Sequence, residues 1–159
     1  MFERFGEFDS AREINELAEN LFNENDIDSL KVLAKENGIP EEFVIAYIEG
    51  DIPELCDAGT AAIGKLEIEA EKLEPKEIMA DWLEYIRCQV MEDDILGFRV
   101  RKKGKSLEGC IAYMLQWSYK HQIDIPERIR KEAGMSGRVT IGIPGMERAH
   151  ELIREYYLR

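Results

Sequence analysis

The stretch RVRKKGKS, residues 99–106, gathers five cations into seven residues and ends in the letters of a phosphate-binding loop. In a P-loop the backbone curls around the phosphates, which requires a glycine five positions before the glycine of GKS. Arg99 stands at that position, and Gly97 lies two residues too early. The preceding letters EDDILGF are also not a continuous β-branched strand. The sequence therefore predicts no nucleotide hydrolysis at this run.

The basic run has two interpretations, and the sequence leaves both open. It is either the solvated C-terminal end of a helix that stops at Gly104, where cations favour the helix dipole, or a loop that contacts nucleic acid or another partner. If all five cations contacted phosphates of a nucleic acid, the logarithm of the binding constant would fall with the logarithm of the salt concentration with a slope of about −3.5 to −4.5. The candidate binding residues are Arg99, Arg101, Lys102, Lys103 and Lys105.

Carboxylates form a second group with regular spacing. Glu67, Glu71 and Glu74 follow i, i+4, i+7 spacing on a helix predicted over about residues 54–73. Carboxylates on successive helix turns lie about 5 to 6 Å apart, which is close to the phosphate spacing of a nucleic-acid strand. Such an acidic ridge can occupy a basic groove of a partner protein. An ordinary solvated face of a helix gives the same pattern.

Metal-binding and catalytic patterns are weak. Glu92, Asp93 and Asp94 in MEDD lack the spacing and the glycine of a calcium loop, so we interpret them as a solvated turn that adds to the acidic partner-binding surface. His121 and His150 have no cysteine or histidine at metal-ligand spacing, and a Cys–His nucleophile pair lacks its parts. The sequence predicts no catalytic residues, no metal site, no cofactor and no enzyme.

Charge is distributed unevenly along the chain. Residues 1–94 hold 26 acidic and 8 basic side chains, a net charge of −18, whereas residues 95–159 hold 7 acidic and 13 basic ones, a net charge of +6. This asymmetry suggests a charged partner or two regions that attract each other. We divide the chain at residue 94 into an acidic helical region and a basic helical region with short extended segments, expected to pack as one unit.

Length and composition indicate a globular protein. A chain of 159 residues with 45% hydrophobic side chains can bury a core. It has no apolar run of 18 residues and no signal sequence at its start, so we expect a cytoplasmic protein without a membrane span. Its three cysteines are far apart and odd in number, which favours reduced, packed thiols: Cys56, Cys88 and Cys110.

The elements that position these groups are predicted to be mostly helices. Ser10 and Glu13 form a capping box before a helix over about residues 10–24, and Asp26 or Asp28 caps a second helix that ends near Gly38. A third, short helix follows in IPEEFVIAYIEG.

Further helices are expected in the second part of the chain. Pro75 separates the helix at 54–73 from a helix in KEIMADWLEYIRCQVMEDD, and Ser106 caps another of about 16 residues. QIDIP and RVTIGIP alternate apolar with polar residues or glycine and predict two short strands, with a small helix between them and a terminal helix after them. The expected fold is a compact, mostly α protein with one short two-stranded β element near the C-terminus. Apolar residues on the terminal helix fit either a monomer or a homodimer.

Two segments carry a resemblance to a known family. VRKKGKSLEGCIAYML and IGIPGMERAHELIREYY together resemble the C-terminal region of PcfK-like proteins, which are small proteins of conjugative plasmids and phages. That family overlaps with a group of type II anti-CRISPR proteins that inhibit Cas9. The resemblance covers about residues 95–159 and contains no catalytic motif.

The resemblance implies inhibition by binding inside a bacterial host. Cas9 holds its guide and target in positively charged channels, so the acidic region is expected to occupy such a channel while the basic run touches guide RNA or DNA. The alternative is a nucleic-acid-binding accessory protein of a conjugative plasmid or phage. The first hypothesis predicts that charge reversal in the acidic ridge abolishes nuclease association, and the second that neutralising the basic run abolishes DNA or RNA binding.

Overall fold

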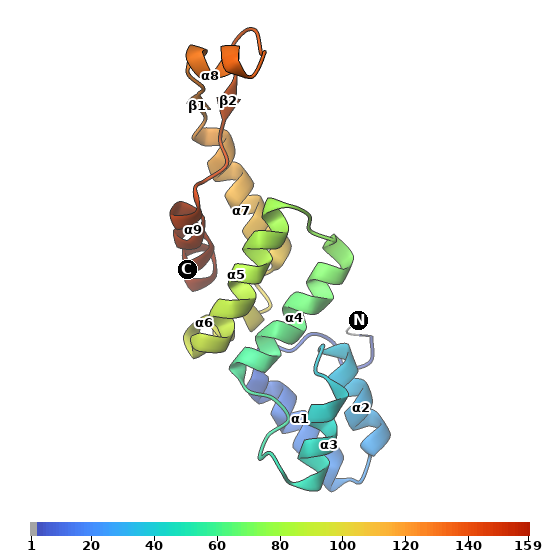
Figure 1. Ribbon diagram of the computed structural model, residues 1–159. Coiled ribbons are helices and arrows are strands. Elements are labelled where there is room, and N and C mark those ends of the chain that lie inside the picture. Colours follow the sequence, from blue (N-terminus) through green and yellow to red (C-terminus); the bar gives the residue numbers. More distant parts are fainter. Residues whose placement is uncertain (1–2) are drawn as a thin grey trace.

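A computed structural model describes residues 3–159, and these residues form nine α-helices and one two-stranded antiparallel sheet (Figure 1). The mostly α class with a short β element near the C-terminus is confirmed. The helices are α1 Ala11–Asn23, α2 Ile27–Glu36, α3 Glu41–Glu49, α4 Ala58–Leu73, α5 Ile78–Glu92, α6 Asp94–Arg101, α7 Leu107–Lys120, α8 Glu127–Glu132 and α9 Met146–Leu158. The strands are β1 Ile123–Asp124 and β2 Thr140–Ile141.

Capping residues start several helices where the sequence predicts. The Ser10 hydroxyl accepts the N–H of Glu13 at 3.3 Å and begins α1, Asp26 rather than Asp28 caps α2, and Ser106 accepts the N–H of Gly109 at 2.9 Å to begin α7. These side chains satisfy N–H groups that have no partner within the helix.

The break at Pro75 separates two helices that lie side by side. The chain reverses in the loop between them, so α4 and α5 are antiparallel neighbours (Figure 1). A separate short helix, α6, follows α5 because Asp93 caps it and accepts the N–H groups of Ile95 and Leu96. The basic run therefore begins inside α6 and leaves it at Arg101, ahead of Gly104.

The buried side chains form two clusters, and the boundary between these clusters differs from the position at which the net charge of the chain changes sign. The first cluster belongs to α1, α2, α3, the segment that leads into α4 and the start of α4 itself, and includes Ile14, Leu30, Leu55 and Ala61. The second joins α4, α5, α6, α7 and α9, and includes Ile86 and Tyr157. Residue 94, after which the net charge changes sign, is the first residue of α6, so this boundary separates elements that share the second cluster. Net charge reflects the surface, whereas the clusters reflect the buried apolar positions.

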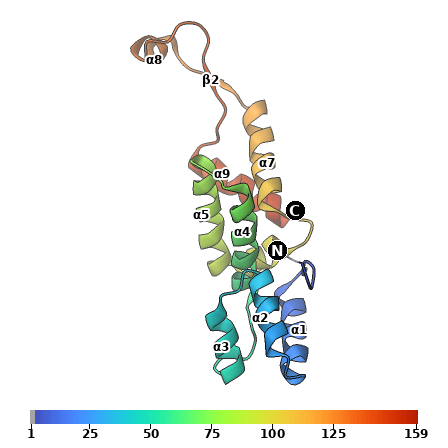
Figure 2. The same cartoon turned by 90° about the vertical axis from the view of Figure 1, so that its right-hand side faces the viewer.

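The helices stack into an elongated molecule with a projection at one end. In both views α1, α2 and α3 lie at one end, α4 to α7 and α9 lie in the middle, and the hairpin with α8 extends from the other end (Figures 1 and 2). The hairpin pairs Ile123 with Ile141 and Asp124 with Thr140. Among the described residues, no helix has the length and apolar character needed to cross a bilayer.

Candidate protein-binding surfaces

Arg101 from the basic run lies in the interior. Its side chain is 0% exposed, and its guanidinium donates to the Phe8 carbonyl at 3.2 Å, the Ala61 carbonyl at 3.1 Å and the Asn37 side-chain oxygen at 2.5 Å. These partners come from the N-terminal segment, from α4 and from the end of α2. Arg101 thus ties the first cluster to the second, and its guanidinium cannot reach a phosphate of a partner.

Lys65 completes this buried joint from α4. Lys65 is 2% exposed. Its ammonium donates to the carbonyl oxygens of Lys102 and Lys105 at 2.6 Å each, and it lies 3.5 Å from a carboxylate oxygen of Glu7. Burial lowers the pKa of Lys65, while the nearby carboxylates of Glu69 and Glu7 act in the opposite direction. The basic run is therefore held in place through its own backbone carbonyls.

Two further cations of the run also bind within the protein. Lys102 pairs with Asp9 at 2.8 Å, and this hydrogen bond is the main reason why the pKa of the Asp9 carboxyl is lowered. Lys105 donates to the Tyr156 carbonyl at 2.7 Å and lies over the Tyr156 ring. Within the described chain, only Arg99 and Lys103 of the five have no hydrogen bond or ion pair on the side chain.

The GKS letters do lead into a helix N-terminus, but a carboxylate of the protein lies against it. The N–H of Leu107 donates to a Glu69 oxygen at 3.1 Å, and the N–H of Ser106 donates to the Tyr156 hydroxyl at 3.2 Å. Burial raises the pKa of Glu69, although Lys65 and the Leu107 N–H partly offset that effect. Because helix N-termini attract anions, Glu69 takes the place that a phosphate has in a P-loop.

The predicted acidic ridge is broken up by neighbouring cations. Glu67 binds Arg87 of α5 through two hydrogen bonds of 2.7 and 3.0 Å. Glu71 is exposed but lines a shallow groove together with Lys35 and Lys72. Glu74, the residue after α4, is exposed. Glu67 and Glu71 lie one turn apart on α4, and Glu74 follows its end, so the three carboxylates do not form an uninterrupted anionic row.

The second acidic group of the prediction divides in the same way. Glu92 and Asp94 are exposed, whereas Asp93 caps α6 and pairs with Arg154 of α9 at 2.8 Å. The hydrogen bond from Arg154 is the main cause of the lowered pKa of Asp93. The turn at MEDD thus joins α6 to α9 through Asp93.

The strongest concentration of negative charge lies elsewhere, in the unit formed by residues 3–57, which we call the acidic unit. It holds 16 acidic and 4 basic side chains, a net charge of −12, and residues 58–159 hold 17 of each. The whole net charge of the protein therefore belongs to the acidic unit. Counting charges over 57 residues instead of 94 reveals it in the sequence, but only the fold shows where the unit ends.

A groove on the acidic unit is lined by carboxylates. It lies between α1 and the segment that joins α3 to α4, and has a volume of about 630 Å³. Glu16, Glu19, Glu54 and Asp57 line it, and the one cation among its lining residues, Arg12, pairs with Glu16 at 2.9 Å. The groove therefore keeps an excess of negative charge that suits lysine or arginine side chains of a partner.

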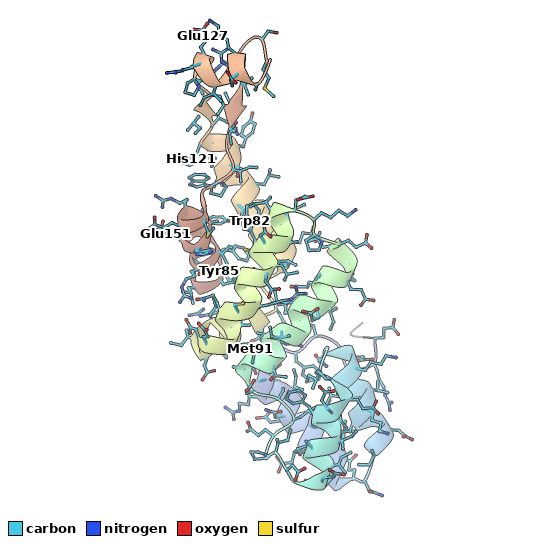
Figure 3. The ribbon with its side chains drawn as sticks, in the orientation of Figure 1. Trp82, Tyr85, Met91, His121, Glu127 and Glu151 are labelled. Carbon is cyan, nitrogen blue, oxygen red and sulfur yellow. The ribbon has the colours of Figure 1, made fainter. Side chains whose placement is uncertain are left out.

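The histidines and cysteines take structural positions. His121 stacks on Trp117 and its Nδ1 lies 2.8 Å from the Trp117 carbonyl oxygen, while His150 stacks on Tyr85, which Figure 3 shows between α5 and α9. Cys56 and Cys110 are buried, and burial raises the pKa of each thiol to about 12. Cys88 is exposed on α5, so the prediction of a packed thiol is wrong for this residue. Among the described residues, no group of three or more histidine, cysteine, aspartate or glutamate side chains is placed to hold a metal ion.

Comparison with known proteins adds no relative. No protein-family model matches this chain, and no curated protein or solved structure shows significant similarity to it.

Proposed function

We propose that this protein acts without catalysis, by docking its acidic unit onto a positively charged surface of a partner that handles nucleic acid. The observation that supports this proposal is the location of the entire net charge, −12, in residues 3–57. Charge concentrated at one end of an elongated molecule orients it toward a basic partner and accelerates their encounter.

The carboxylates of the acidic unit are largely available for contact. Exposed examples occur on each of its three helices, directly after α1 and in the segment after α3, namely Glu19, Glu24, Asp28, Glu41, Glu49 and Glu54. The groove beside α1 offers a recess in which cationic side chains of a partner can lose part of their solvent. An acidic docking surface of this kind competes with the phosphates of a nucleic acid for the same partner cations.

A guide-loaded Cas9-type nuclease is the specific partner that we propose. Such nucleases hold nucleic acid in positively charged channels that recognise backbone geometry. The resemblance of residues 95–159 to PcfK-like and type II anti-CRISPR proteins suggests this target, and the acidic unit supplies a surface that can compete for its channel. In this arrangement α4 to α9 form the scaffold to which the acidic unit is attached.

The first test is target-DNA cleavage by several guide-loaded type II-A Cas9 orthologues with increasing amounts of this protein. The protein is added either before or after the target DNA. We expect complete inhibition near an equimolar amount when the protein is added first and weaker inhibition when DNA is already bound. An absence of inhibition at 100-fold excess with every orthologue would reject the nuclease as the target.

Matched charge reversals test which surface docks. The triple variant Glu19→Lys, Glu49→Lys, Glu54→Lys alters the acidic unit, and Glu108→Lys, Glu132→Lys, Glu147→Lys makes the same charge change at exposed positions of the C-terminal region. We expect at least a tenfold loss of inhibition only for the first variant. Equal losses in both variants would show that net charge alone matters and would contradict docking through the acidic unit.

A further inference from the structure

The hairpin and α8 form an arm, residues 122–145, that has no hydrophobic core. Between Met114 and Ala149 the only buried residues of the described chain are Gly142 and Pro144, and no large apolar side chain is buried there. Figure 3 places His121 near the base of the arm and Glu127 near its far end, away from the other helices. The arm is held by polar contacts, including Arg138 with Asp124 and the Ile125 N–H donating to the Val139 carbonyl at 2.8 Å.

One face of the hairpin is apolar and open to solvent. Because side chains alternate along a strand and Ile123 pairs with Ile141, these two residues share a face, which Ile143 continues two positions later. Asp124 and Thr140 belong to the other face. The arm exposes five large apolar side chains by 48% to 64% of their surface: Ile123, Ile129, Met135, Ile141 and Ile143.

Three further exposed side chains belong to α7 and α9, the helices that precede and follow the arm in the chain. Leu115 and Tyr119 lie one turn apart on α7 and are 68% and 82% exposed, and Met146 at the start of α9 is 78% exposed. A buried side chain of this size hides on the order of 100 Å², so the eight together present roughly 500 Å² of apolar surface. A protein–protein interface of standard size buries a comparable apolar area, about 500 Å² on each partner.

The hairpin also leaves backbone groups open for pairing. In the described structure the sheet has two strands only, so each strand has an outer edge without a neighbour. Two-stranded hairpins are barely stable alone, and an open edge pairs readily with another strand. An ordered arm with an apolar face and two open edges is therefore suited to association.

Charge identifies a second copy of this chain as the occupant. The arm holds three acidic and four basic side chains, a net charge of +1, so two arms repel each other only weakly. Its net charge is also too small to attract an acidic unit strongly. The acidic units lie at the opposite end of the molecule, so pairing through the arms keeps two charges of −12 apart (Figure 1). We propose that two copies associate through their arms in a two-fold symmetric dimer.

The mass of the full-length protein in solution tests this proposal. Sedimentation equilibrium from 1 to 200 µM is expected to show a concentration-dependent shift from 18.4 kDa to twice that mass. Added salt is expected to strengthen the dimer, because it screens the two acidic units and leaves the apolar contact intact. A constant mass of 18.4 kDa over the whole range would overturn the proposal and leave the arm to a different partner.

Charge placed on the arm separates association from folding. Ile141→Glu and Ile141→Lys are each expected to be monomeric, while an equal mixture of the two is expected to form a mixed dimer. Ile45→Glu on α3 is the matched control, because Ile45 is 49% exposed and Ile141 is 48% exposed. The proposal fails if Ile45→Glu weakens the dimer as much as the Ile141 variants do. It also fails if an equal mixture of the two Ile141 variants remains monomeric.

Backbone hydrogen exchange gives an independent readout. Amides at residues 123–125 and 139–143 are expected to exchange more slowly at 200 µM than at 1 µM, while amides of α3 keep the same rate. Slower exchange in α1 and α3 instead would indicate contact through the acidic unit and contradict association through the arms. Because this measurement needs no nuclease, it does not depend on the function proposed above.

Discussion

At the residue scale, the fate of Arg101 shows how one side chain decides between two interpretations. A cation in a dense basic run is normally solvated, yet this one is buried and directs its donors to oxygen atoms from three separate segments. Guanidinium groups suit this role because their planar fork can bind several acceptors at once. Without Arg101, the Phe8, Ala61 and Asn37 oxygens would each lose this charged donor.

Substituting Arg101 by alanine is expected to lower the free energy of unfolding by about 3 kcal/mol or more, because it leaves buried acceptors unpaired and opens a cavity. Urea unfolding followed by circular dichroism measures this loss. Lys103→Ala removes an exposed cation from the same run and is expected to change stability by less than about 0.5 kcal/mol. Similar midpoints for the two variants would show that the Arg101 contacts contribute little.

Asp93 supplies a prediction about pH. Its pKa is lowered, first through the hydrogen bond from Arg154, so its contribution to stability is present above the ordinary value of 3.8 and disappears as pH falls through the lowered pKa. Asp93→Asn keeps a side chain that caps α6 but removes the charge. The variant is expected to be less stable than the wild type at pH 7.

The difference between Asp93→Asn and the wild type is expected to shrink as pH falls below 3.8, because the wild-type carboxyl then also becomes neutral. Urea midpoints at pH 7, 4 and 2.5 follow the trend. Arg154→Gln provides the matched control, since it removes the partner and should show the same pH dependence. A gap that stays constant with pH would mean that the contact acts through packing and not through charge.

At the element scale, the contact between the end of α2 and the middle of α4 joins the two clusters. Gly64 lies so close to this loop that a Cβ atom there would come within 2.1 Å of the Asn37 carbonyl oxygen. Gly38, which follows Asn37 with φ +69°, meets the Gly64 backbone from the other side. The same loop presents the Asn37 side chain to Arg101. Close backbone packing and the buried arginine contact therefore depend on each other.

Gly64→Ala is expected to destabilise the protein by about 1–3 kcal/mol, because backbone atoms at this crossing must move apart to admit a methyl group. This expected loss of stability is larger than the stability that the higher helix propensity of alanine would add. Gly104→Ala is the control, since a Cβ at Gly104 meets nothing within 4 Å. Thermal unfolding compares the variants, and a Gly64→Ala protein as stable as the wild type would show that the crossing is loosely packed.

At the scale of the whole molecule, the distribution of charge argues against strong binding to free nucleic acid. The acidic unit repels phosphates, and of the five cations in the basic run only Arg99 and Lys103 keep side chains without a polar partner in the described structure. The accessory-protein hypothesis depends on these two cations. It is for this reason that we favour a protein partner.

Binding to a fluorescent 20-base-pair duplex measures the remaining affinity for DNA. If Arg99 and Lys103 alone contact phosphates, the slope of the log binding constant against log salt concentration is expected to be about −1.8. Lys103→Glu should then abolish binding at 50 mM salt, whereas Glu71→Lys leaves the slope near this value. A slope near −4 would contradict this expectation, because it would require phosphate contacts from further cations besides Arg99 and Lys103.

Local patterns in the sequence by themselves determined most of the elements. Ser10, Asp26 and Ser106 start helices because a cap needs only a side chain and the next few N–H groups, and the hairpin follows from alternation within two short segments. The chain could also be recognised as bipolar by counting charges.

Only the tertiary structure decided which charged groups remain on the surface. Arg101 meets Asn37 across 64 residues, and Lys102 meets Asp9 across 93, so no local spacing reveals either partner. Glu69 reaches the start of α7 for the same reason. The sequence shows which side chains are charged and therefore prefer to be hydrated. Only folding determines whether buried oxygen atoms or carboxylates of the protein replace the water around such a side chain. The acidic unit and the exposed face of the arm emerge from these long-range contacts.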